Sequence, residues 1–484
     1  MRLTNVRSRL TTRGGAELAA PRASRVAAPR TPGWFRASVV LGAAVLVISV
    51  TYLSWDPGGR QAPPSSGSAV AEASRGGSLG QAPTRTNADE LERLIRAYEA
   101  RVRTQPNVTD LTFLGRLYFE KGRLTGDVGT YAQADEALRR SLDIYPSDAE
   151  ARSLLASVRY VSHAFSSALQ ISGSLYRADD TAYGALAVLG DSQLELGMYG
   201  HAAETYAELS RALPAVPAVD VRASRLAFLE GDVEGALRLA EIAESEARSA
   251  GIFGAGLAWY RAYRGQLEFE TGNYRASERL YNSALRTAPD YHVALSGLGR
   301  AQAALGDPAA AIDSYRRAIA IVPQPDYLSA LGDLYGLEGR AGPARRQYDT
   351  VRLIGTLDEI NEQVFNRQIV LFRADHDIGL TQALASARAE LRIRKDVYGY
   401  DAYAWALYKN GNYSKARTAA DQALRLGTKD ARLLYHSGLI SAALGDEDRA
   451  RAELSGALAI SPRFDPLQAG RARAALARLD RGPG

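Results

Sequence analysis

Beyond residue 107, apolar positions recur with the period of a helix, and the helices that they predict come in pairs. Four segments have similar C-terminal ends, and each is predicted to form the second helix of a pair: HAAETYAELSRALP, RASERLYNSALRTAP, AAAIDSYRRAIAIVP and RARAELSGALAISP. In three of them an alanine precedes a large residue by four positions, a small or apolar residue by seven and a proline by twelve. Because proline cannot continue a helix, each segment predicts a helix that ends there. The alanines are Ala202, Ala311 and Ala450, and Ser277 takes the place of the alanine in the second segment.

The first helix of each predicted pair carries two recurring small residues. One lies midway along the helix and lets the second helix approach closely, so that the large residue of the second helix fills the gap. The other is a glycine that ends the first helix in a left-handed backbone conformation. The mid-helix residues are Gly115, Gly190, Gly265, Gly299, Gly332, Ala404 and Gly438, and the terminal glycines are Gly197, Gly272, Gly306, Gly339, Gly411 and Gly445.

This pattern resembles the tetratricopeptide repeat (TPR), a helix-turn-helix unit of about 34 residues. Unit starts lie 34 positions apart at Ala149, Tyr183 and Pro217, and again at Val397 and Ala431. The resemblance implies an all-α fold, an α-solenoid of about ten units over residues 108–464 that forms a right-handed superhelix. Residues 88–107 and 465–484 are expected to be capping helices at its two ends.

Three places depart from the regular unit. The first unit carries an insert, LTGDVGT (124–130), before its second helix. The fourth is followed by GIFGAGL (251–257), which predicts either a lengthened helix or a loop. The eighth, residues 363–396, lacks both the mid-helix glycine and the final proline.

An uncharged apolar stretch near the N-terminus predicts a membrane segment. Residues 37–55 would form a helix of roughly 28 Å, enough to cross the hydrocarbon core of a bilayer. Trp34, Tyr52 and Trp55 lie at its ends, where interfacial aromatics are expected. Residues 56–87, rich in Gly, Ser, Pro and Ala, predict a disordered linker.

The charges beside this segment predict its orientation. Residues 1–36 contain eight arginines, whereas only Arg60 follows the segment closely. Positive flanks stay in the cytoplasm, so the sequence predicts a basic cytoplasmic tail and a single-pass anchor in the cell membrane. The solenoid would then lie outside the cytoplasm. The alternative is a signal peptide cleaved near Ala69-Val70-Ala71, although that site lies well beyond the apolar stretch.

Composition narrows the possible functions. The net charge of +5 comes from residues 1–36, which carry +7, so residues 37–484 sum to −2 and do not favour nucleic-acid binding. The abundance of alanine and the excess of arginine over lysine are typical of a GC-rich bacterial genome. There is no cysteine, and the five histidines do not have metal-ligand spacing. The densest polar cluster, ADHD (374–377), falls at an inter-helix turn, where such residues are ordinary. We therefore expect no cofactor and no enzymatic activity.

The resemblance implies that the first helices line a concave face that holds a protein or peptide partner. By position, the residues on this face would be Arg116, Phe119, Asp191, Gln266, Phe269, Arg300, Asp333, Trp405, Tyr408 and Tyr435. Six of them are predicted to bind the partner: Phe269, Arg300, Asp333, Trp405, Tyr408 and Tyr435. For each of them, packing between repeats is the competing interpretation.

Three functions follow from this sequence. The first is a membrane-tethered scaffold for protein interaction. The second is an accessory subunit that positions a separate envelope enzyme, a polymerase or a transferase. The third, an enzyme in its own right, would have to be built on the solenoid itself.

Overall fold

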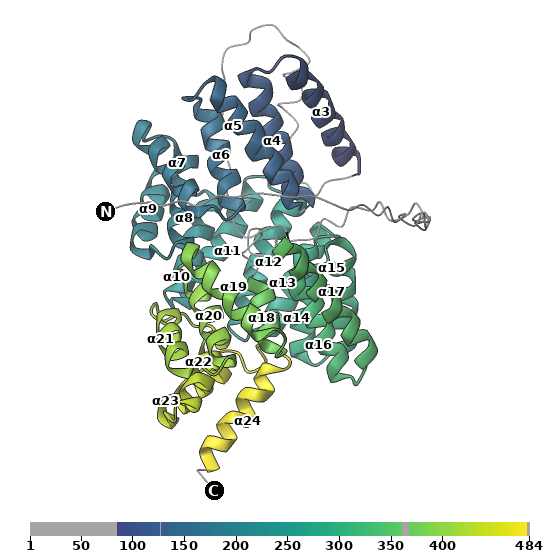
Figure 1. The fold of residues 1–484 in the computed structure, drawn as a ribbon, viewed down its shortest axis with the longest axis vertical. Coiled ribbons are helices and arrows are strands. Elements are labelled where there is room, and N and C mark those ends of the chain that lie inside the picture. The colour runs from purple at the N-terminus through teal and green to yellow at the C-terminus, as the bar shows by residue number, and fades with distance from the viewer. Residues whose placement is uncertain (1–84, 126, 361–366, 482–484) are drawn as a thin grey trace, which may run out of the picture. The chain divides into compact units, whose positions relative to one another are not determined.

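The computed structural model describes residues 85–125, 127–360 and 367–481, and every regular element in these ranges is a helix (Figure 1). The helices are α3 (Arg85–Thr104), α4 (Val108–Thr125), α5 (Val128–Ile144), α6 (Ala149–Val161), α7 (Phe165–Ala178), α8 (Tyr183–Glu195), α9 (Tyr199–Ala212), α10 (Pro217–Leu229), α11 (Val233–Ser249), α12 (Gly254–Glu270), α13 (Tyr274–Thr287), α14 (His292–Leu305), α15 (Pro308–Ile321), α16 (Pro325–Leu337), α17 (Ala341–Ile360), α18 (Arg367–Asp375), α19 (Leu380–Ile393), α20 (Val397–Lys409), α21 (Tyr413–Ala423), α22 (Ala431–Ala443), α23 (Glu447–Ile460) and α24 (Gln468–Arg481).

The predicted membrane segment at 37–55, the basic tail and nearly all of the linker at 56–87 lie outside the described residues. Among the helices that are described, none combines the length and the apolar character needed to cross a bilayer.

Consecutive helices pack as pairs, from α4 with α5 to α22 with α23. Several first helices also contact the first helix of the next pair, as α6 contacts α8 and α20 contacts α22. This stacking is that of an α-solenoid, so the predicted all-helical repeat architecture is confirmed for the described residues.

The small residues in the first helices have the predicted structural role. A Cβ atom added to Gly190 would lie 2.5 Å from the Tyr206 ring, and one added to Gly299 would lie 2.9 Å from the Tyr315 ring. Both distances are too short for real carbon contacts, so only glycine lets the large residue of the second helix fill this space. The six turn glycines predicted to be left-handed all have positive φ, between 72° and 90°.

The irregular units are built mainly by changes in helix length. Most of the predicted insert at 124–130 extends the first pair, because α4 continues to Thr125 and α5 begins at Val128. The GIFGAGL segment separates two lengthened helices, α11 and α12, of 17 residues each, compared with 13 in α10 and 14 in α13.

Candidate protein-interaction surface

The six residues predicted to bind a partner all lie on first helices of the pairs. Phe269 is on α12, Arg300 on α14, Asp333 on α16, Trp405 and Tyr408 on α20, and Tyr435 on α22. Phe269, Trp405 and Tyr435 are each 1% exposed, and Asp333 is also buried. Arg300 and Tyr408 are half-buried. The structure brings these residues together in two groups and leaves Asp333 in a third place.

The first group is an aromatic cluster centred on Trp405. Its indole stacks on Tyr408, with ring centroids 4.9 Å apart, and on His436 at 4.2 Å. Tyr435 lies 5.9 Å from Trp405 and contacts Phe464 at 5.6 Å. The aromatic residues of α20 and α22 therefore lie together, and the cluster also includes a histidine and Phe464 from the segment before α24.

A hydrogen bond fixes the orientation of the Trp405 ring. Its Nε1 donates to Oδ1 of Asp375 at 2.8 Å, and the side-chain amide of Gln468 donates to the same oxygen at 2.8 Å. Helix α24, where Gln468 lies, packs against α22 and α23. The first-helix face of the last units is thus covered by residues that follow the last pair.

The second group joins Phe269 and Arg300. The Arg300 guanidinium lies 3.9 Å from the centroid of the Phe269 ring, a cation–π arrangement, and pairs with Glu270 at 2.7 Å. Its other terminal nitrogen donates to the carbonyl of Phe464 at 3.5 Å. Arg300 therefore bridges α12, α14 and the chain before α24.

Asp333 accepts hydrogen bonds from its own unit and from the next. The Tyr348 hydroxyl donates to it at 2.7 Å, and His376 Nε2 lies 2.7 Å from the same oxygen. His376 belongs to the ADHD turn, in which Asp377 also pairs with Lys409 at 2.6 Å. Together with the Asp375–Trp405 bond, these contacts make the turn a polar junction between units, a role that its ordinary turn composition did not indicate.

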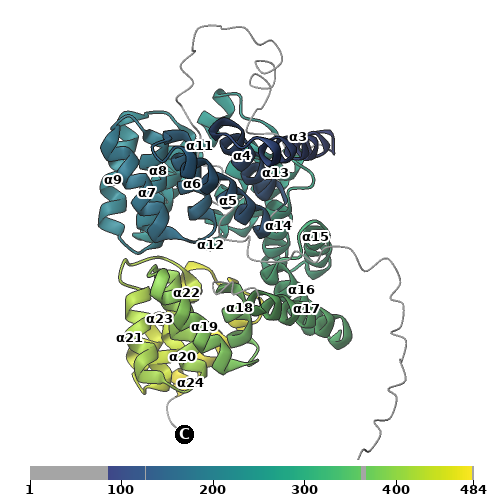
Figure 2. The same ribbon diagram turned by 45° about the horizontal axis from the view of Figure 1, so that its top comes forward.

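A polar contact line joins residues that are far apart in sequence. The Tyr199 hydroxyl accepts from the Val397 amide at 2.9 Å, Thr428 donates to the Leu229 carbonyl, and the hydroxyls of Tyr274 and Ser461 lie 2.9 Å apart. These pairs are separated by 198, 199 and 187 positions. We call this line of contacts the seam. Figure 2 shows the helices from α18 onward as a layer below α6–α12 in that view.

Turn glycines let the backbones approach at the seam. Gly231 and Gly272 have φ of 83° and 81°, and a Cβ atom on them would lie 2.6 Å from the Gly427 carbonyl oxygen and 2.7 Å from that of Ile460. Left-handed φ and close backbone approach both require glycine here. Gly272 therefore has a second role besides ending its helix, and the repeat pattern did not reveal that role.

A buried ion cluster lies at one end of the seam. Glu195 of α8 pairs with Arg225 of α10 at 2.6 Å and with Arg394, which follows α19. Burial raises the pKa of Glu195, but the attraction of Arg394 and Arg225 outweighs this effect and lowers the pKa to about 2. Arg394 also lies over the Phe165 ring, 5.4 Å from its centroid.

The described residues contain no group of three or more potential ligands that could hold a metal ion. Like His376, His436 has an acidic partner, since its Nδ1 lies 2.9 Å from Asp401. Its side chain is fully buried against Trp405, so no substrate reaches it in this arrangement. The geometry is that of a packing element rather than of a general base.

Comparison with known families identifies the repeat. A family model described as tetratricopeptide repeat matches residues 264–324 and 402–463. The first match runs from within α12 to just beyond α15, and the second from within α20 to just beyond α23. These two stretches therefore match tetratricopeptide repeats, the repeat that the turn glycines and paired helices indicated.

Several solved structures align with most of the chain at low identity. The APC/C hetero-tetramer Cut9–Hcn1 is 14% identical, with 81% of this chain and 94% of that chain covered and a TM-score of 0.32. Yeast Tom70 is 13% identical, with 82% and 94% covered and a TM-score of 0.33. The human IFIT1 dimer with PPP-AAAA is 14% identical, with 77% and 87% covered and a TM-score of 0.41. No curated protein matches the sequence.

Proposed function

We propose that this chain is a membrane-tethered scaffold whose repeat domain lies outside the cytoplasm and binds a partner protein or peptide. The observation that supports this most directly is the repeat array itself, because helix pairs occupy nearly all of the described residues. Stacked repeats present extended surfaces, and such surfaces serve for binding other chains.

The partner-binding residues that we propose divide by accessibility. Arg300 and Tyr408 are half-buried and can contact another chain as the structure stands. Trp405 and Tyr435 are buried, and a partner reaches them only if the segment around Phe464 and Gln468 moves. Phe269 and Asp333 are also buried, Phe269 against Tyr274 and Arg300 and Asp333 against Tyr348 and His376. We therefore place the first contact at the half-buried residues.

Site-specific crosslinking in intact cells tests this surface. A photoreactive side chain at Tyr408 should give a discrete adduct between the full chain and another protein. The matched control is Ile321, which is 43% exposed at the end of the second helix α15, away from the first-helix residues of this surface. Equal crosslinking from both positions, or none from Tyr408, would contradict binding at this face.

The tether and its direction rest on the uncharged 37–55 segment and its arginine-rich N-terminal flank. A reporter that is active only outside the cytoplasm, fused after Gly484, should be active. Activity of a cytoplasmic reporter at that position, with an inactive external one, would show the opposite orientation.

An accessory role is the second candidate. In that case the partner would be a separate envelope enzyme, a polymerase or a transferase, which the repeats position. Identification of the protein crosslinked at Tyr408 distinguishes the two, because an enzyme would appear as the adduct in the accessory case.

A further inference from the structure

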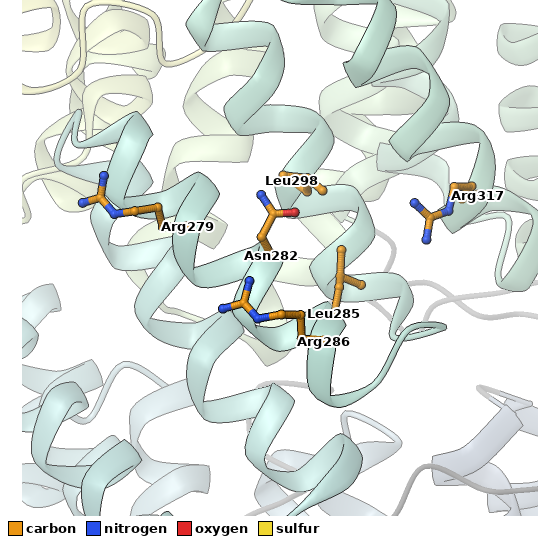
Figure 3. Close-up of a pocket in the computed structure, with 6 residues that line it drawn as sticks. All are labelled: Arg279, Asn282, Leu285, Arg286, Leu298 and Arg317. Atoms are coloured by element: carbon orange, nitrogen blue, oxygen red, sulfur yellow. The ribbon is translucent and has the colours of Figure 1, made fainter.

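A hollow of about 620 Å³ lies where α13, α14 and α15 meet, away from the residues discussed above. Sites for small ligands commonly have volumes of about 300–1,000 Å³. In Figure 3, Arg279, Asn282 and Arg286 follow one helix and Arg317 comes from another helix across from them. The lining residues are Arg279, Asn282, Leu285, Arg286, Leu298 and Arg317, and none of them is acidic.

The three arginines of this hollow have no partners. Arg279, Arg286 and Arg317 are exposed, and their guanidinium groups form no hydrogen bond or ion pair with any residue that the structure describes. On the neighbouring helix α12 the arginines are neutralised, since Arg261 pairs with Glu244 and Arg264 with Glu241, both at 3.1 Å. The arginines of the hollow therefore differ from those of α12, because no carboxylate pairs with them.

The repeat supplies an internal comparison for these positions. Arg279, Asn282 and Arg286 precede the terminal proline of their segment by ten, seven and three positions. The residues at the same places in the other three segments with this ending are Glu204, Ala207 and Arg211, then Asp313, Arg316 and Ala320, then Ala452, Ser455 and Ala459. The repeat fold does not require the combination of residues found in α13, so these residues serve a purpose other than the fold.

The chemistry of the lining selects the ligand. Guanidinium groups bind phosphate through paired charge-assisted hydrogen bonds, and an amide adds a donor and an acceptor. A site with three cations and no carboxylate suits a ligand group that carries more than one negative charge and several acceptor oxygens. Leu285 and Leu298 offer an apolar surface for the carbon part of the same molecule. We propose that this hollow binds the phosphate group of a small soluble molecule.

Titration calorimetry with inorganic pyrophosphate tests the proposal on the full chain. The variant Arg279→Gln/Arg286→Gln/Arg317→Gln should bind pyrophosphate at least about tenfold more weakly than the wild type. The matched control is Arg275→Gln/Arg316→Gln/Arg346→Gln, which removes the same charge from exposed arginines on α13, α15 and α17 that do not line the hollow. The arginines of residues 1–36 are present in all three proteins, so their contribution cancels.

The outcomes separate a site from a general electrostatic attraction. Retained affinity in the control variant, with loss in the pocket variant, supports the proposal. Equal loss in both variants, or no pyrophosphate binding by the wild type, overturns it. A parallel assay uses vesicles of phosphatidylglycerol. If the pocket variant loses binding to these vesicles while pyrophosphate binds neither protein, the hollow contacts a membrane surface and the proposal of a soluble ligand is overturned. Thermal melts establish that both variants remain folded.

Discussion

Replacing Trp405 with alanine should lower the free energy of unfolding by about 3–5 kcal/mol, the usual cost of truncating a large aromatic in a core. The side chain is 1% exposed and stacks on both Tyr408 and His436. Its removal leaves a cavity and also takes away the Nε1 donor that Asp375 accepts from. The loss is measured by urea denaturation of the full chain and its variant.

The matched control for this substitution is Tyr413→Ala. Tyr413 is 40% exposed on the adjacent helix, so its truncation should change the free energy of unfolding by less than about 1 kcal/mol. Trp405 was also predicted to contact a partner, and the same variant tests that. Loss of partner capture at an unchanged melting temperature would show that Trp405 is a contact residue and would contradict the packing role that its burial supports.

Replacing Glu195 with glutamine should destabilise the protein by about 3–5 kcal/mol at neutral pH. Glu195 is 2% exposed and lies between the guanidinium groups of Arg225 and Arg394. The neutral amide removes the counter-ion of Arg225 and one of the two carboxylates that face the buried Arg394, the other being Asp396 at 3.4 Å, and uncompensated charge inside a protein is costly. Glu204→Gln on α9 is the control, because Glu204 is exposed and its loss should cost less than about 0.5 kcal/mol.

The dependence of stability on pH gives a second measurement of Glu195. Its pKa falls from the usual 4.5 to about 2 in the folded protein, so the folded state binds its proton less readily than the unfolded state does. The stabilisation is fully present above pH 4.5 and is lost as the pH falls toward 2. It amounts to about 3 kcal/mol for a shift of this size. The free energy of unfolding of the Glu195→Gln variant should therefore lack this decrease between pH 4.5 and pH 2. An identical dependence on pH in both proteins would contradict the role of the ion cluster.

The features that could be predicted from the sequence are those that repeat. Gly190 and Gly299 recur at a fixed place because each unit meets the same steric problem, that of fitting Tyr206 or Tyr315 between two helices. The turn glycines recur because each first helix ends in the same left-handed conformation. A local geometric requirement that is imposed in every unit leaves a periodic signal, and such a signal can be found without any structure.

The seam could not be predicted in this way. It joins Tyr199 to Val397 and Tyr274 to Ser461, and each contact depends on the rotation between units summed over the intervening repeats. Small differences in each rotation decide whether distant turns meet, and no single residue encodes the sum. The burial of Trp405 could not be predicted for a similar reason. Its position in the repeat places Trp405 on a first helix, but Gln468, which helps to cover it, lies in α24.

The seam also constrains the number of repeats. In an open array, one repeat more or less changes only the length of the surface, because each unit contacts only its neighbours. Here the turn at Gly231 must meet Gly427, and the turn at Gly272 must meet Ile460. Inserting or deleting a unit between α13 and α19 would displace every later turn from its partner by one unit. Changes in length are therefore tolerated before α8, and natural variation in repeat number should be confined to that end of the array.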